Sequence, residues 1–274
     1  MITLNPQYLP GAALVICGKA RAVRPGRVCY SETMAPSPAA TPVILHPRGI
    51  LFDMDGVLVS SIGSVERTWE KWALARGIDP ELAIRMAHGR RAIETVRELR
   101  PDLNDVEELQ WLEEMEVADG VDVSILDGVR PILDSLPAQY WTVVTSATER
   151  IARSRIQHGK IRMPARIVSA EDVQLGKPNP EPYRLGAEIL GLQPEECLVI
   201  EDSASGAQAG HAAGCIVLAT LFSHSLESLT CADYIVRSLE DVHVQVPETP
   251  GAPLTVRLTP VARDVSEAVR SAHL

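Results

Sequence analysis

Two acidic pairs follow short apolar runs in this chain. Asp53 and Asp55 stand in the motif F-D-M-D-G-V, and Glu201 and Asp202 stand in L-V-I-E-D-S-A-S-G. Apolar runs of this length predict buried parallel strands, whose carboxyl ends meet at one edge of a sheet. Carboxylates brought together at that edge are costly unless a cation lies between them. Either pair alone could be a turn or a helix cap. Together the two pairs predict an oxygen-ligand site for Mg²⁺, in which one aspartate acts as nucleophile and another handles a proton.

Two further residues are candidates for binding an anion. Ser146 follows an expected strand in V-V-T-S-A-T, where a hydroxyl and backbone N–H groups at a helix N-terminus can hold a phosphate. Lys177 stands in G-K-P-N-P-E-P-Y, whose prolines stiffen the loop, so that the ammonium could neutralise a phosphate and the nucleophilic acid. Taken singly, each has an ordinary alternative, a helix N-cap for the hydroxyl and a solvated surface position for the lysine.

Charge and cysteine content exclude several classes of partner. The 274 residues carry 26 Lys and Arg against 36 Asp and Glu, a formal net charge of −10. Such a chain repels nucleic acid and anionic membranes, so any phosphate must be held locally, and neither partner is expected. Apolar runs fall short of the ~20 residues that a membrane helix needs. The five cysteines are scattered without C-x-x-C spacing, which argues against structural zinc or disulfides and favours a cytoplasmic protein.

The pattern of elements predicts an α/β fold with an inserted helical cap. After the first strand the chain reads as mostly helical over residues 62–119, and only beyond residue 127 do strands alternate with ten-residue helices. That alternation predicts a doubly wound, mostly parallel, Rossmann-like sheet. The catalytic core is therefore expected at residues 48–62 and 128–245, and the all-helical cap at 63–127. Strands are expected at 141–145, 165–169, 197–200 and 215–219, and helices at 81–87, 92–99, 105–117, 148–158, 180–190 and 204–213.

Both ends of the chain differ from this pattern. Residues 1–47 mix Pro, Ala, Gly and Arg without a helical or strand period, so we expect a disordered extension there. Residues 246–274 form a C-terminal tail. At its start, V-H-V-Q-V and L-T-V-R-L flank the turn-like P-E-T-P-G-A-P, which indicates an edge hairpin.

The order of the four motifs carries a resemblance to a known family. D-x-D-G-V, a strand-end Ser, G-K-P-x-P and E-D-x-x-x-G, in this order, resemble the haloacid dehalogenase superfamily over about residues 48–242. The helical insert is similar to that of the β-phosphoglucomutase-like subgroup. In the cap, S-V-E-R-T-W and A-H-G-R-R-A-I-E-T-V resemble phosphatases of sugar and polyol phosphates, including those of 2-deoxyglucose 6-phosphate and glycerol phosphate.

The resemblance implies a role for each motif. Asp53 would be the nucleophile that becomes an aspartyl-phosphate. Asp55 would protonate the leaving oxygen and then activate water, while its backbone carbonyl contacts Mg²⁺. The phosphoryl group would be bound by Ser146 and Lys177, and the metal by Asp53, Asp55, Glu201 and Asp202. One departure is Ser60, because many relatives carry an acid just before the hydroxyl residue at position 61.

The turn at residues 88–91 is the candidate for substrate recognition. His88, Gly89 and Arg90 lie between two expected cap helices, and loops that face a catalytic edge often carry specificity. The alternative is a polar turn with solvated arginines. The sequence thus predicts a Mg²⁺-dependent phosphatase for a small sugar or polyol phosphate, with a phosphomutase on the same scaffold as the alternative. A phospho-accepting receiver module fits less well. In a receiver the acidic pair precedes the acceptor Asp, the Thr and the Lys, and there is no helical insert, whereas here the second acidic pair follows Lys177 and an insert is present.

Overall fold

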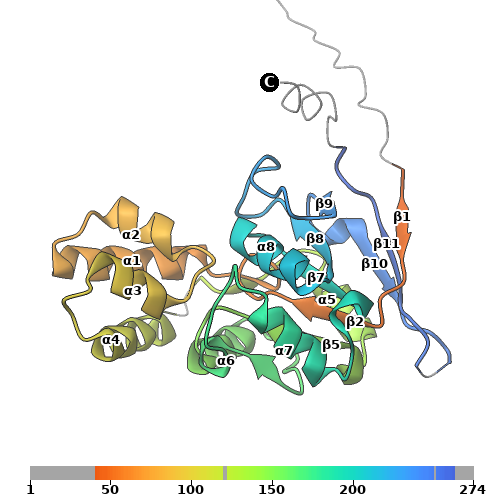
Figure 1. Ribbon diagram of the computed structural model, residues 1–274, viewed down its shortest axis with the longest axis horizontal. Helices are drawn as coiled ribbons and strands as arrows, with labels where there is room; N and C mark the ends of the chain where they lie inside the picture. Colours follow the sequence, from red (N-terminus) through yellow and green to blue (C-terminus); the bar gives the residue numbers. More distant parts are fainter. Residues whose placement is uncertain (1–40, 120–121, 250, 263–274) are drawn as a thin grey trace, which may run out of the picture. The chain divides into compact units, whose positions relative to one another are not determined.

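A parallel sheet of six strands forms the centre of the chain (Figure 1). The computed structural model describes residues 41–119, 122–249 and 251–262. Every neighbouring pair of strands in this sheet is parallel. The strands lie in the order β6 (Ile167–Val168), β5 (Trp141–Val144), β2 (Gly49–Phe52), β7 (Cys197–Glu201), β8 (Ile216–Thr220) and β9 (Tyr234–Val236). The predicted α/β, doubly wound sheet is confirmed, although the sequence pattern did not indicate β9.

Helices cover both faces of this sheet. Along β2, Ile50 and Phe52 join one apolar cluster and Leu51 joins another, because successive side chains of a strand point to opposite faces. The first cluster also contains side chains of α5 (Val129–Ser135) and α6 (Glu149–His158). The second contains those of α7 (Glu181–Ile189) and α8 (Ala204–Ala213). Burial on both faces explains why the central strands read as continuous apolar runs.

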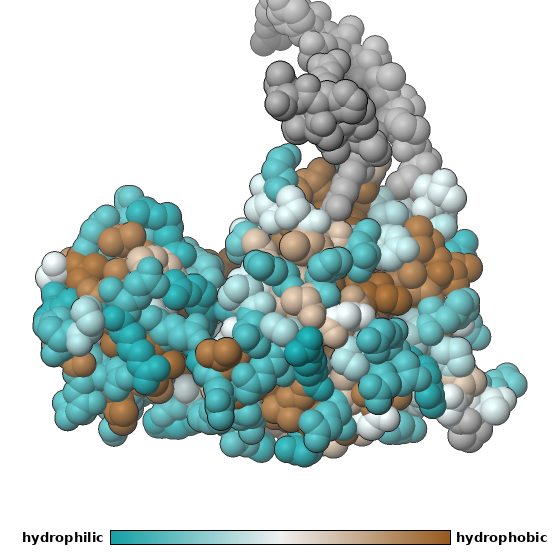
Figure 2. Space-filling view, viewed as in Figure 1, coloured by the Kyte–Doolittle hydropathy of each residue, from teal (hydrophilic) through white to brown (hydrophobic). Residues whose placement is uncertain are grey.

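The insertion between β2 and α5 is a helical cap with its own core. Its helices are α1 (Ile62–Arg76), α2 (Pro80–Ala87), α3 (Ala92–Leu99) and α4 (Asp105–Ala118). Trp69 and Trp72 of α1 pack edge to face, 5.3 Å between ring centroids, in an apolar cluster separate from those of the sheet. The face drawn in Figure 2 carries mainly hydrophilic side chains over the cap. A short antiparallel pair, β3 (Val59–Ser60) and β4 (Ser124–Ile125), joins the two ends of the insertion.

A second sheet corrects the prediction for the N-terminal segment. Residues 1–40 lie outside the described residues, but Val43–Leu45 form strand β1, so a disordered extension over residues 1–47 was wrong for that part. β1 pairs antiparallel with β11 (Thr255–Leu258), which pairs with β10 (Val242–Gln245). The Leu45 side chain joins the same apolar cluster as Val256, a contact between distant segments that local composition does not reveal. The predicted hairpin is present as β10 and β11, in this separate sheet.

Among the described residues, no helix is both long and apolar enough to cross a bilayer.

Candidate active site

The carboxyl ends of β2 and β7 bring three buried carboxylates together. Asp53 follows β2, Glu201 ends β7 and Asp202 comes next; each offers an oxygen within 4.8 Å of the others. The Lys177 ammonium reaches the cluster from the loop before α7 and donates to Asp53 Oδ1 at 2.5 Å and to Glu201 Oε1 at 2.7 Å. All four side chains belong to residues that are at most 7% exposed. Residues singled out from three separate sequence motifs therefore meet at one point.

Burial leaves this cluster short of positive charge. Three carboxylates and one ammonium carry two net negative charges when all are ionised. Burial raises the pKa of Asp53 to about 7, although Lys177 opposes the rise. Burial, together with the charges of Glu201 and Asp53, raises the pKa of Asp202 well above its usual value. The donor set of oxygens at a buried, negatively charged point fits a divalent cation that prefers oxygen ligands.

The Glu201 carboxylate is already fully engaged by hydrogen bonds. Its Oε1 accepts from Lys177 and from the hydroxyl of Tyr183 at 2.7 Å. Its Oε2 accepts from the backbone N–H of Asp202 at 2.9 Å and from the N–H and hydroxyl of Ser203, both at 3.0 Å. Burial opposes ionisation, but these donors, Lys177 first, lower the pKa of Glu201. The geometry suits a residue that fixes Lys177 better than one that ligates a metal.

Two glycines allow the acidic motifs to interlock. Gly56 has φ +81°, and a Cβ added there would lie 1.8 Å from Asp202 Oδ2. A Cβ on Gly206, in the first turn of α8, would lie 1.7 Å from Glu201 Oε1. A side chain at either position would displace a carboxylate of the cluster. The glycines of D-x-D-G and E-D-x-x-x-G are therefore part of the site, because they provide room for its acids.

Asp55 has different neighbours from Asp53. Its Oδ1 accepts from the Ser61 hydroxyl at 2.5 Å, at the start of the cap, and its Oδ2 accepts from Arg155 Nη1 at 2.6 Å. Arg155 lies on α6 and also pairs with Glu116 of the cap helix α4. Arg155 was not among the candidate residues predicted from the sequence. The signal was its position four residues after Ile151, on the buried face of an amphipathic helix where a cation is unusual.

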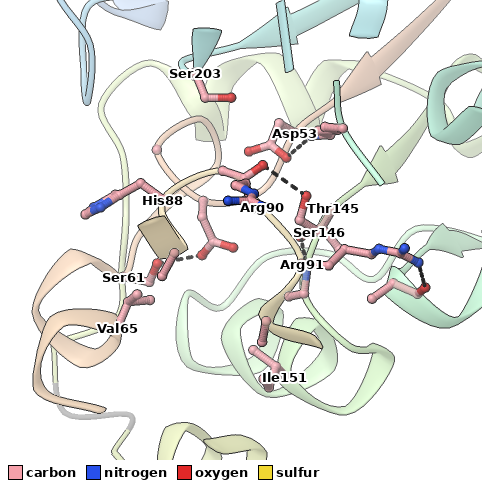
Figure 3. Close-up of a pocket in the computed structure, with 18 of the residues that line it drawn as sticks. Asp53, Ser61, Val65, His88, Arg90, Arg91, Thr145, Ser146, Ile151 and Ser203 are labelled. Carbon is pink, nitrogen blue, oxygen red and sulfur yellow. Dashed lines mark hydrogen bonds and ion pairs between the residues drawn. The ribbon is translucent and has the colours of Figure 1, made fainter. Parts of the chain in front are cut away.

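The cap turn closes one side of a small cavity above Asp53. The cavity has a volume of about 130 Å³, and Gly89 is among its lining residues. Figure 3 shows His88, Arg90 and Ser146, which also line it. The Ser146 hydroxyl donates to the Gly89 carbonyl at 3.4 Å, so the candidate phosphate-binding serine lies where the cap touches the core. The N-cap of α6 is Thr148 and not Ser146, which leaves the serine on the cavity side.

The arginines of the cap turn have different environments. Arg90 is partly exposed and donates to Glu98 at 2.9 Å. Arg91 is buried and donates to the backbone carbonyls of Val173 at 2.9 Å and Gln174 at 2.8 Å, in the loop that leads to Lys177. Arg91 therefore fastens the cap to the core, a role that its place in a polar turn did not reveal.

Comparison with known proteins places this geometry in a family. The family model of the haloacid dehalogenase-like hydrolases matches residues 47–214. The chain belongs to this family. It is 37% identical over 202 residues to hexitol phosphatase A of Escherichia coli, covering 72% of this chain and 94% of the relative. It is 32% identical to glycerol-1-phosphate phosphohydrolase 2 of Saccharomyces cerevisiae, covering 74% and 87%.

A solved structure agrees with this assignment at the level of the fold. The β-phosphoglucomutase of Clostridium difficile superimposes with a TM-score of 0.61 at 21% identity, covering 70% of this chain and 92% of that one. The family resemblance expected from the four motifs is confirmed, and this haloacid dehalogenase-like chain is an enzyme of the hydrolase class.

Removing the Tyr183 hydroxyl tests the hydrogen-bond network of Glu201. We expect Tyr183→Phe to lower the free energy of unfolding by about 1.5–3 kcal/mol, because a buried carboxylate loses a donor. Tyr234→Phe, a half-buried tyrosine of β9, is the control and should change stability by less than about 0.5 kcal/mol. Urea denaturation of both variants measures the difference. Equal, small losses of unfolding free energy in the two variants would contradict a stabilising hydrogen bond from Tyr183 to Glu201.

Proposed function

We propose that this hydrolase is a Mg²⁺-dependent phosphatase that cleaves a small sugar or polyol phosphate through an aspartyl-phosphate on Asp53. The observation that carries the proposal is the contact between the Lys177 ammonium and the buried Asp53 carboxylate, next to Asp202. A nucleophilic carboxylate with cations beside it suits transfer of a phosphoryl group, whose negative charge must be offset. The substrate class is supported by the names of two relatives, which refer to hexitol and to glycerol 1-phosphate.

The reaction divides into two displacements at phosphorus. In the first, an Asp53 oxygen forms a bond to phosphorus, the bond to the leaving oxygen breaks, and Asp55 gives that oxygen a proton. In the second, Asp55 takes a proton from water while the water oxygen attacks phosphorus and the bond to Asp53 breaks. Lys177 and the Ser146 hydroxyl hold the phosphoryl oxygens through both steps. Lys177 also limits the rise in the pKa of Asp53 that its burial causes.

The metal in this proposal is held by the aspartates. The Asp53 and Asp202 carboxylates and the Asp55 backbone carbonyl would bind Mg²⁺, which would offset negative charge on the transferring phosphoryl group. Glu201, which the family resemblance implied as a ligand, is assigned instead to positioning Lys177, because five hydrogen bonds already occupy its oxygens.

Selectivity for the leaving group is assigned to the cap turn. The Nδ1 atom of His88 is hydrogen-bonded to the Ile84 carbonyl at 2.9 Å. Nε2 is therefore the ring atom that would meet a substrate hydroxyl. Arg90 would reach the substrate by exchanging its exposed pair with Glu98. The Gly89 carbonyl touches Ser146 and contributes to the fit of the turn over the phosphoryl group. In the cell we place this activity in the cytoplasm, with a small phosphate monoester as partner and neither nucleic acid nor membrane.

Replacing the nucleophile tests the covalent route. Asp53→Asn keeps the volume of the side chain but removes its nucleophilicity, so turnover should fall by at least about 10³-fold while the fold is kept. The measurement is release of inorganic phosphate from glycerol 1-phosphate, with circular dichroism as the check on folding. If the wild-type enzyme forms an isomeric phosphate ester and releases no free phosphate, the phosphomutase alternative is favoured. A folded variant with a substantial fraction of wild-type activity would rule out Asp53 as nucleophile.

Metal binding has a readout that does not depend on activity. At about 100 times its Kd, Mg²⁺ should add about 2.7 kcal/mol to the free energy of unfolding of protein that has been stripped with a chelator. Asp202→Asn should abolish most of this gain. Asp102→Asn changes an exposed acid of the cap, paired with Arg100, and should keep it. Equal Mg²⁺ responses in the two variants would argue against the proposed ligands.

The cap turn predicts a loss that depends on the substrate. We expect His88→Ala or Arg90→Ala to lower kcat/KM for glycerol 1-phosphate by about 10- to 150-fold, the loss of one strong hydrogen bond. The values for 4-nitrophenyl phosphate, which lacks the hydroxyls, should change much less. Arg85→Ala removes an exposed arginine of α2 and serves as the control. If both substrates lose equally, the turn has a structural role only.

A further inference from the structure

A buried arginine connects the second aspartate of the first motif to the cap. Arg155 is 6% exposed and lies on α6 of the core. Its Nη1 donates to Asp55 Oδ2 at 2.6 Å, and its Nη2 donates to Glu116 of the cap helix α4. The other oxygen of Asp55 accepts from Ser61. One guanidinium is therefore shared between two carboxylates, that of Asp55, which is the proposed acid and base, and that of Glu116 in the cap.

The chemistry of arginine makes this sharing directional. A guanidinium presents several donors in a rigid plane, so it can hold two carboxylates at fixed angles to each other. All three groups are largely withdrawn from solvent, with side chains 8% exposed for Arg155, 7% for Glu116 and 30% for Asp55. Separating charges in such surroundings costs far more than at a surface. The orientation of Asp55 is thus tied to the position of Glu116.

The contact between α4 and α6 has a second ion pair that does not touch Asp55. Glu113, three residues before Glu116, accepts from the Thr148 hydroxyl at 2.6 Å and pairs with Arg150 at 3.1 Å. Seating of the cap helix on the core therefore rests on two acids of α4. Only one of them is connected to Asp55 through Arg155, which provides a matched control for the other.

We propose that Arg155 is a positioning residue that aims the Asp55 carboxyl at the leaving oxygen, and that Glu116 makes this aim depend on the seating of the cap. This inference rests on the proposed phosphatase function and adds to it a pair of residues that couple cap closure to proton donation. Arg155 itself touches neither the phosphoryl group nor the metal in this account. It acts through Asp55.

Substrates whose leaving groups differ in their need for a proton test whether Arg155 and Glu116 act through proton donation by Asp55. A polyol leaves as an alkoxide unless it receives a proton, whereas 4-nitrophenolate leaves without one. The ratio kcat/KM covers only the steps up to the departure of the leaving group, so it isolates proton donation from the later hydrolysis of the aspartyl-phosphate. A variant that misplaces Asp55 should therefore lose kcat/KM on glycerol 1-phosphate and keep it on 4-nitrophenyl phosphate.

The test compares four variants on these two esters. Arg155→Gln should lower kcat/KM for glycerol 1-phosphate by about 100-fold, a usual size for general acid catalysis, and that for 4-nitrophenyl phosphate by less than about 3-fold. Arg155→Lys, which keeps the charge, should recover part of the loss. Glu116→Gln keeps the shape of a buried side chain and should show a smaller loss with the same selectivity. Glu113→Gln should leave the ratio of the kcat/KM values for the two esters as it is in the wild type.

Two results would overturn the inference and leave the proposed function intact. Equal losses on both esters for Arg155→Gln and Glu116→Gln, or a Glu113→Gln variant as selective as Glu116→Gln, would mean that these residues only hold the cap in place. A wild-type enzyme that hydrolyses no sugar or polyol phosphate would overturn the proposed function and, with it, this inference. If the wild-type enzyme is active but the variants lose kcat/KM equally on both esters, the proposed function is kept and the inference about Arg155 and Glu116 is rejected.

Discussion

The ion pair between Lys177 and two buried acids is the interaction on which the rest of the site depends. Its ammonium lies 2.5 Å from Asp53 Oδ1 and 2.7 Å from Glu201 Oε1, in surroundings where an unpaired charge would be strongly destabilising. Glu201 is held in turn by Tyr183 and by backbone N–H groups at the start of α8. The parallel sheet is what makes this possible, because it ends β2 and β7 side by side and so brings the two acids to one lysine.

The cap contributes contacts to this core in addition to covering it. Arg91 fastens the turn after α2 to the loop that carries Lys177, and Glu116 reaches Asp55 through Arg155. Each contact joins the cap to a different one of the four sequence motifs of the core. In the proposed function, enclosure of the substrate and alignment of the proposed reacting groups would therefore be mechanically connected, with the core binding the phosphoryl group and the cap binding the remainder.

Much of the fold and the site's main acids could be predicted from the sequence. Asp53 and Asp202 stand in short motifs directly after strands, Lys177 stands in the loop between β6 and α7, and the side of the sheet on which strands end is fixed by the parallel topology. Strand β1 was missed, because its pairing with β11 joins segments about 200 residues apart and leaves no local pattern. Arg155 was missed for a related reason, since its partners Asp55 and Glu116 come from distant parts of the chain.

The proposed function depends above all on transfer of the phosphoryl group to Asp53. The most direct test is to mix the enzyme with Mg²⁺ and glycerol 1-phosphate, quench with acid within the first turnover, and locate the phosphoryl group by peptide mass spectrometry. We expect an acyl phosphate on the peptide that contains Asp53, absent when Asp53 is replaced by Asn. Turnover with no phosphorylated peptide at any quench time, or with phosphate on another residue, would contradict it.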